Sequence, residues 1–217
     1  MPLQNRVDPT GDIVRDPGRG LFTGNRGCLH RADRELGGSR WRSKLWICCV
    51  LDWRGRQRDV MPPGRWTALF FLDEATALAA GHRPCAYCRR RDFLAYAEAW
   101  RCAYQLRERP RAAEMDARLH GERVDPRTRR QRTGRALFAD LPDGAMIGLD
   151  GPALKLGGLA LPWSFAGYGE PVAAGGEVEV LTPPSTVAVL AAGYRPVLHP
   201  TALHPTALHP TALRRVP

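Results

Sequence analysis

Lysine is almost missing from this chain of 217 residues, in which Lys44 and Lys155 are the only two. Arginine therefore supplies nearly all of the positive charge, and the formal net charge is +10 at pH 7. A strongly basic chain favours acidic partners, nucleic acid first among them. A chain rich in arginine, alanine and proline is also what a GC-rich coding sequence produces. Charge alone leaves both explanations open.

Long apolar runs are absent as well. No segment approaches the ~18 consecutive apolar residues of a membrane span, and the opening MPLQNRVDPTGDIVRDPGRG has no apolar stretch of the kind a secretory signal carries. We therefore expect no membrane partner and a cytoplasmic location. In that compartment the cysteines, at positions 28, 48, 49, 85, 88 and 102, are expected to be thiols or metal ligands and not disulfides.

Familiar catalytic signatures are missing too, since the chain has no Gly-x-Ser-x-Gly, no His-Glu-x-x-His and no phosphate-binding glycine loop. The one candidate pair is Asp116 and His120, four residues apart in AAEMDARLHGERV. An aspartate could orient the histidine as a general base, or the two could hold a catalytic metal. An exposed helix with an ordinary i,i+4 pair gives the same pattern. Whether the protein is an enzyme stays open at this point.

Two apolar stretches in the first half predict short strands. LWICCVLDW (45–53) is rich in β-forming residues, and a Gly-Arg turn is expected to fold it back on QRDVMP (57–62) as a hairpin. Strand alternation places Cys49 on the apolar face of Ile47 and Cys48 on the other face. Cys49 is therefore the expected inward member of this adjacent pair.

The next stretch, TALFFLDEATALAAGHRP, predicts a strand over 68–72 that leads into a short helix. Asp73 is the expected N-cap, and Gly81 is the expected left-handed stop after Ala80. LAAGYRP (190–196) nearly repeats LAAGHRP (78–84). We interpret the echo as one solution to a local problem, a short helix ended by glycine and redirected by proline, in preference to an ancient duplication.

The sequence predicts two longer helices after this segment. Aromatic residues at helical spacing predict one over about 89–106, and their default place is the core. Pro110 and Pro126 bracket another, in which Met115 and Leu119 form the apolar stripe.

The sequence predicts an α+β protein, with a zinc-stabilised β-hairpin and helix module followed by a small antiparallel β unit. Residues 1–44 are expected to be loops with a short strand. The sequence predicts a zinc module with its following helix over 1–106 and a charged helix with a basic linker over 107–136. A β-rich unit that ends in a short helix is expected over 137–198, and a disordered tail of HPTAL repeats over 199–217. The sequence does not indicate an oligomeric state.

The most specific chemical signal is Cys85-Ala-Tyr-Cys88. Its thiolates can face one ion, and the helix N-terminus and arginines that follow favour the thiolate form. Two core cysteines or a redox pair are the alternatives. A closed zinc site needs four ligands. Cys28 and His30, one residue apart in GNRGCLH, are the preferred second pair, and Cys49 is their competitor.

FFLDEATALAAGHRPCAYC resembles the second half of the metal-binding domain of Ada-type DNA repair proteins. The resemblance covers about residues 68–90 and implies that Cys85 and Cys88 form a zinc-binding pair and that Arg83 and Pro84 form the preceding turn. The family's first pair, two cysteines four apart of which one accepts a methyl group, has no counterpart here. The resemblance therefore implies a zinc scaffold without that methyl-transfer site. The segments GNRG, FFLDEATALAAGHRPC and LPWS are also similar to those of a bacterial protein family.

These observations predict a zinc-containing nucleic-acid-binding protein in which Zn²⁺ is structural and DNA is the favoured partner. Phosphate contacts are expected from Arg83, Arg89, Arg90 and Arg91, and from arginines in 26–65 and 127–135. Base stacking is possible for Trp41, Trp46, Trp66 and Trp163, although core burial is the default for each. The alternatives are a nuclease-like enzyme that uses Asp116 and His120, and a structural or interaction protein whose basic character is only compositional.

Overall fold

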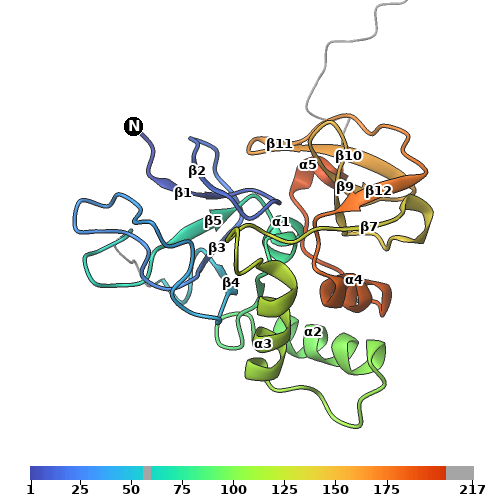
Figure 1. Ribbon diagram of the computed structural model, residues 1–217, viewed down its shortest axis with the longest axis horizontal. Helices are drawn as coiled ribbons and strands as arrows, with labels where there is room; N and C mark the ends of the chain where they lie inside the picture. Colours follow the sequence, from blue (N-terminus) through green and yellow to red (C-terminus); the bar gives the residue numbers. More distant parts are fainter. Residues whose placement is uncertain (56–59, 204–217) are drawn as a thin grey trace, which may run out of the picture.

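A short helix that is buried on every side joins the two halves of the molecule. The computed structural model describes residues 1–55 and 60–203. In it, every residue of α1 (Glu74–Ala79) is buried, and the helix lies between two β-sheets (Figure 1). The Asp73 side chain accepts a hydrogen bond from the Thr76 N–H at 2.9 Å, and Gly81 has a φ of 79°. The predicted N-cap and left-handed stop are therefore confirmed.

The first sheet has the strand order β2-β1-β5-β3-β4-β6. Pairing is antiparallel except for β1 with β5 and β4 with β6, which run parallel. The strands are β1 (Gln4–Val7), β2 (Ile13–Arg15), β3 (Phe22–Asn25), β4 (Ile47–Val50), β5 (Leu69–Phe71) and β6 (Arg83–Pro84).

The second sheet is antiparallel throughout, with the order β11-β10-β9-β8-β12-β7. Its strands are β7 (Gly134–Leu137), β8 (Met146–Gly148), β9 (Pro152–Leu156), β10 (Leu159–Ser164), β11 (Gly167–Tyr168) and β12 (Glu177–Val180).

Three longer helices gather beside α1, at the lower side of the view in Figure 1. The helices after α1 are α2 (Arg90–Ala103), α3 (Ala112–Arg123), α4 (Pro184–Ala191) and α5 (Pro200–Leu203), with a 3₁₀ turn η1 (Phe138–Asp140). Helix α4 packs on both α2 and α3. Among the described residues, no helix has the length and apolar character needed to cross a membrane.

One hydrophobic cluster draws on both halves of the chain. Phe93, Tyr96 and Trp100 of α2 and Met115 of α3 pack with apolar residues of the second sheet and of α4. The predicted aromatic face of the first long helix and the apolar stripe of the second are buried here. The described chain is therefore a mixed α+β structure in which α2, α3 and α4 share one hydrophobic cluster with the second sheet.

Several local expectations need correction. Residues 1–44 contain three strands, of which β2 lies at the edge of the first sheet and β1 and β3 each pair with two neighbours. Their β-forming signal is weak in sequence, and the pairing partners decide the conformation. Strand β4 pairs with β3 and β6. The expected return strand at 57–62 falls largely outside the described residues, and 60–62 form no strand. Strand β7 begins at Gly134, inside the predicted linker.

The start of the disordered tail was also predicted too early in the sequence. Its first repeat forms α5, with Pro200 at the first helical position, where proline costs no hydrogen bond. Thr201 is buried, and its hydroxyl accepts a hydrogen bond from the Tyr168 N–H at 2.8 Å. The rest of the tail, from residue 204, lies outside the described residues.

Two adjacent carboxylates at the start of α1 tie the halves together. Asp73 accepts hydrogen bonds from the Tyr168 hydroxyl (2.8 Å) and the His199 N–H (3.0 Å). Glu74, which is fully buried, accepts from the Tyr194 hydroxyl (2.6 Å) and pairs with Arg89 (2.8 Å). Burial of two carboxylates is costly unless each is fully hydrogen-bonded. The network therefore holds α1, α2 and the second sheet in one arrangement.

We expect Glu74→Gln to destabilise the fold by about 3–5 kcal/mol, because it leaves the buried Arg89 without its main counter-charge. Urea unfolding followed by circular dichroism measures the change. Glu98→Gln is the matched control, since the Glu98–Arg101 pair lies on the exposed side of α2 and its loss should leave unfolding unchanged. Equal unfolding midpoints for the two variants would contradict the role given to Glu74.

Candidate metal centre

Strand β4 presents two adjacent cysteines to opposite sides of the first sheet. Cys48 is fully buried and packs with Leu69, Ala77 and Ala80 toward α1. Cys49 is half-buried and lines a cleft on the other face. This reverses the expected order, in which Cys49 was the inward member. Both faces of β4 are apolar in sequence, so alternation separates the two residues without saying which face α1 covers.

The segment from Cys85 to Cys88 is a tight turn between β6 and α2. The Cys85 N–H donates to the Cys48 carbonyl (2.9 Å), which extends the pairing of β6 with β4. The Tyr87 N–H points at the Cys85 sulfur (3.4 Å), and the Arg89 N–H donates to the Cys85 carbonyl (3.1 Å). These bonds hold Cys85 and Cys88 beside β4, where Cys49 is the nearest cysteine on the same face.

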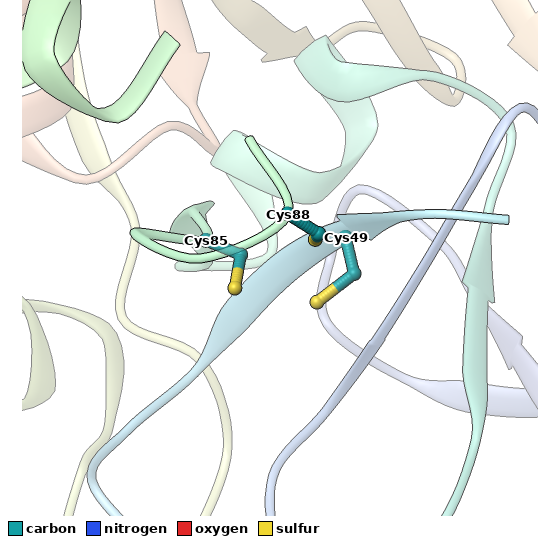
Figure 2. Close-up of side chains that lie close together, drawn as sticks. All are labelled: Cys49, Cys85 and Cys88. Carbon is teal, nitrogen blue, oxygen red and sulfur yellow. The ribbon is translucent and has the colours of Figure 1, made fainter. Parts of the chain in front are cut away.

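The sulfur atoms of Cys49, Cys85 and Cys88 all lie within 4.8 Å of one another. Figure 2 shows the three side chains together, Cys49 on β4 and the other two on the turn. Tetrahedral zinc with Zn–S bonds near 2.3 Å needs sulfur separations of about 3.8 Å, which small side-chain adjustments provide. The donor set therefore fits a thiophilic metal ion.

The three thiols also act on one another's ionisation. Hydrogen bonds from Cys49 and Cys88 lower the pKa of Cys85, and the hydrogen bonds of Cys49 with Cys85 and Cys88 raise the pKa of Cys49. The arrangement concentrates negative charge on sulfur next to the first turn of α2, where a helix dipole favours it. Burial instead raises the pKa of Cys48, which stays a neutral thiol inside the sheet.

All three cysteines line one cleft of about 850 Å³. Its volume lies in the range of small-molecule and cofactor sites. Four aromatic residues contribute to its wall, and they are Trp53, Trp66, Phe70 and Tyr87. Thr23, Asn25 and Asp52 add polar groups. Tyr87 lies between the two cysteines of the motif, and its ring centroid is 5.4 Å from that of Trp53.

The preferred second ligand pair is not part of this group. The His30 ring nitrogens contact the Thr67 hydroxyl (2.7 Å) and the Pro62 carbonyl (3.2 Å). The Cys28 sulfur faces the His30 carbonyl at 3.8 Å. His30 therefore fastens the 62–67 loop, and the structure brings Cys49, the competing ligand, to Cys85 and Cys88.

The arginines of the motif separate into buried and exposed members. Arg83, 1% exposed, donates to both carboxylate oxygens of Asp116 (2.9 and 2.7 Å). Arg89, 4% exposed, is bound to Glu74 and Asp92. Neither has surface left for a phosphate, so the expectation for these two is corrected. Arg90 and Arg91 are exposed on the first turn of α2.

Asp116 and His120 do not form the proposed catalytic pair. Both Asp116 oxygens are occupied by Arg83, and Asp116 is buried. The His120 Nδ1 instead faces the Arg123 guanidinium at 3.5 Å. Burial lowers the pKa of His120, and Arg123 and Lys44 lower it further. An imidazole among cations lacks the carboxylate partner that a triad-like base requires.

The four tryptophans singled out in the sequence have different environments. Trp46 is buried, and Trp41 lies beside it with ring centroids 6.4 Å apart. Trp163 donates to the Thr76 hydroxyl at 3.0 Å, so it packs against α1. Only Trp66 of this set lines the cleft. The other cleft aromatics were missed, although Tyr87 stands between Cys85 and Cys88 in the sequence.

Comparisons with known proteins assign no relative to this fold and site. No family model matches the chain, and neither a curated protein nor a solved structure matches it.

We expect His120 to titrate below the ordinary histidine value of about 6.5, because desolvation and two nearby cations disfavour the charged ring. Proton NMR of the imidazole C–H signals, assigned with His120→Asn, measures this. Since the unfolded chain then binds more protons than the folded one between the two pKa values, the contribution of His120 to stability is fully present above about pH 6.5 and is lost as pH falls from there through the lower folded pKa. A pKa above 6.5 would contradict the cationic surroundings assigned to His120.

Proposed function

We propose that the protein is a zinc-containing nucleic-acid-binding protein whose metal is held by Cys49, Cys85 and Cys88. The observation that carries the proposal is the convergence of three thiols at the wall of an aromatic cleft. Soft thiolate ligands select zinc among the common cellular divalent ions. Because Cys49 comes from β4 and the other two from the β6–α2 turn, a bound ion would cross-link these segments.

A three-thiolate set leaves one tetrahedral position for water or another ligand, as in zinc sites that interact with small molecules. All three ligands line the cleft, so an exchangeable fourth ligand would approach from there. This differs from the initial expectation of a closed structural site with four protein ligands. When bound, the ion would supply a Lewis acid, and Cys49, Cys85 and Cys88 would hold it at the wall of the cleft.

The cleft suits an unpaired base of a nucleic-acid strand. Its aromatic residues provide stacking surfaces, and single-stranded nucleic acid is bound by a combination of stacking and basic surface. Exposed arginines adjoin it in sequence, Arg54 next to Trp53 and Arg65 next to Trp66, while Arg90 and Arg91 follow Cys88. The Arg54 guanidinium lies 5.1 Å from the Trp53 ring centroid. DNA remains the favoured polymer.

Purified wild-type protein is expected to carry one zinc per chain, measured by mass spectrometry. Cys49→Ser, Cys85→Ser and Cys88→Ser should each lose the ion and melt at a lower temperature, because the cross-link between β4 and the turn is removed. Cys28→Ser and His30→Ala are the matched controls and should keep the ion. A metal-free wild type, prepared under reducing conditions without chelator and unable to bind added Zn²⁺, would overturn the metal assignment.

Tyr87→Ala is expected to weaken binding of a labelled single-stranded DNA by about 1–3 kcal/mol, because a stacked base loses its ring partner. Fluorescence anisotropy measures the affinity. Tyr87 is 63% exposed, so the variant should fold, and Tyr87→Phe should retain wild-type affinity.

The charge contribution is tested separately with Arg90→Ala combined with Arg91→Ala. Loss of phosphate contacts should lower the salt dependence of binding, by about 0.7 in log–log slope for each contact to a single strand. The matched control is Arg107→Ala combined with Arg109→Ala, which removes the same number of charges just after the C-terminal end of α2. It should leave the salt dependence unchanged. Identical slopes for the two double variants, together with full affinity of Tyr87→Ala, would favour the interaction protein whose basic character is compositional.

A further inference from the structure

A second cluster of unusual residues surrounds Trp46, remote in role from the cysteines. The Arg123 guanidinium carbon lies 3.7 Å from the Trp46 ring centroid and that of Arg26 lies 4.1 Å from it. The His82 and His120 rings pack on the same indole, with centroids at 5.2 and 6.1 Å. Two guanidinium groups and two imidazoles therefore meet on one aromatic side chain.

Both arginines are buried, with exposed fractions of 2% for Arg26 and 1% for Arg123. Their hydrogen-bond acceptors are carbonyls and imidazole nitrogens. The carbonyls are those of Gly11 and Ala80 for Arg26 and of Gly81 and Lys44 for Arg123, and the imidazole nitrogens are His82 Nε2 for Arg26 and His120 Nδ1 for Arg123. Within 1–55 and 60–203, neither forms a salt bridge with a carboxylate. Carbonyls at the end of α1 bring partial negative charge only.

The described chain therefore gives neither cation a direct carboxylate partner, and only the more distant Asp8 and Asp12 for Arg26 and Asp116 for Arg123 offset part of the charge. Burial lowers the pKa of Arg26 to about 9 and that of Arg123 well below its usual range. In the part of the chain that the structure describes, Arg123 Nε and His82 Nδ1 lack a hydrogen-bond partner. Buried charge and unpaired buried donors are costly, and an anion beside Arg123 would relieve both for that side chain.

A small pocket opens beside this cluster. Arg26, Trp46 and Arg123 line it, and further arginines do so as well, namely Arg40, Arg129 and Arg130. Asp12 is the one acidic residue in its wall. The pocket volume is about 30 Å³. A buried water needs roughly 10–15 Å³, so about two or three oxygen atoms of a small anion fit inside while the rest of the anion stays at the mouth, and a sugar or a base does not fit.

We propose that this pocket binds a phosphate group, with Arg26 and Arg123 at its base and Arg129 and Arg130 at its rim. Guanidinium groups are suited to phosphate because they donate two parallel hydrogen bonds and carry a delocalised positive charge, which a bound anion stabilises. The phosphate can come from free inorganic phosphate or from the end of a nucleic-acid strand. The pocket's dimensions select the phosphate group itself in both cases.

The site is independent of the proposed zinc function. Side chains alternate between the two faces along β4 and the residue before it, so Trp46 and Cys48 share one face. Ile47 and Cys49 lie on the other face and line the aromatic cleft. Failure of one site therefore says nothing about the other. A structural role of Arg26 and Arg123 at the end of α1 is also compatible with phosphate binding, because their carbonyl contacts leave Arg123 Nε unpartnered.

Isothermal titration calorimetry of the zinc-loaded full chain with inorganic phosphate, at constant ionic strength, tests the proposal. Wild type should bind one phosphate, and Arg129→Asn with Arg130→Ala should weaken binding at least about tenfold, a loss of about 1.4 kcal/mol. Asparagine is chosen because Arg129 has a φ of 58°, which Asn tolerates. Both positions are exposed, so folding should survive.

Arg127→Ala with Arg132→Ala is the matched control, because it removes the same charge from the same loop outside the pocket. Equal affinities of the two double variants would overturn the proposal. So would binding that is lost in Cys85→Ser but kept in the Arg129/Arg130 variant, since phosphate would then be a zinc ligand. Competition by a 5′-phosphorylated but not a 5′-hydroxyl oligonucleotide would identify the strand end as the source, and no competition by either would identify free phosphate.

Discussion

The structure depends on two adjacent carboxylates that are buried at the start of α1. Asp73 and Glu74 stay inside only because donors converge on them from β11, α2 and the segment after α4. Removal of any of these donors would leave charge in a low-dielectric interior. Arg89 belongs to this network and directly follows Cys88, so the requirement that neutralises Glu74 also fixes the turn that carries two of the metal cysteines. The buried ion pair in the core therefore helps to set the positions of the cysteines in the candidate metal centre.

Strand β4 then separates two chemical environments over a few residues. On one side, Trp46 and Cys48 face α1, where guanidinium groups and imidazoles surround the indole. On the other side, Cys49 faces the aromatic cleft. A strand does this because successive side chains alternate in direction. The negative charge of the thiolates and the positive charge of the arginines are kept apart by the sheet, which lets each attract its own class of ligand.

Local signals were sufficient for much of the framework. The Asp73 cap, the Gly81 stop and the two long helices follow from capping residues and helical spacing, which act within a few residues. The echo of 78–84 in 190–196 is likewise local: Gly81 and Gly193 both have left-handed φ values, 79° and 104°, and both end a helix. The predictions that failed depend on contacts between residues far apart in the sequence. The choice of Cys49 over Cys28 and His30 depends on which strand β4 pairs with, and neither spacing nor alternation contains that information.

Several arginines of this lysine-poor chain have structural roles in the interior, which the net charge does not reveal. Arg83 grips both oxygens of Asp116, Arg89 bridges Glu74 and Asp92, and Arg26 and Arg123 lie against Trp46. Each task uses the planar, multidentate guanidinium, and a lysine ammonium could not perform it in the same space. A GC-rich coding sequence can account for many surface arginines but not for these four, which are buried. Part of the formal charge therefore belongs to the interior, and the basic surface available to a partner is smaller than +10 suggests.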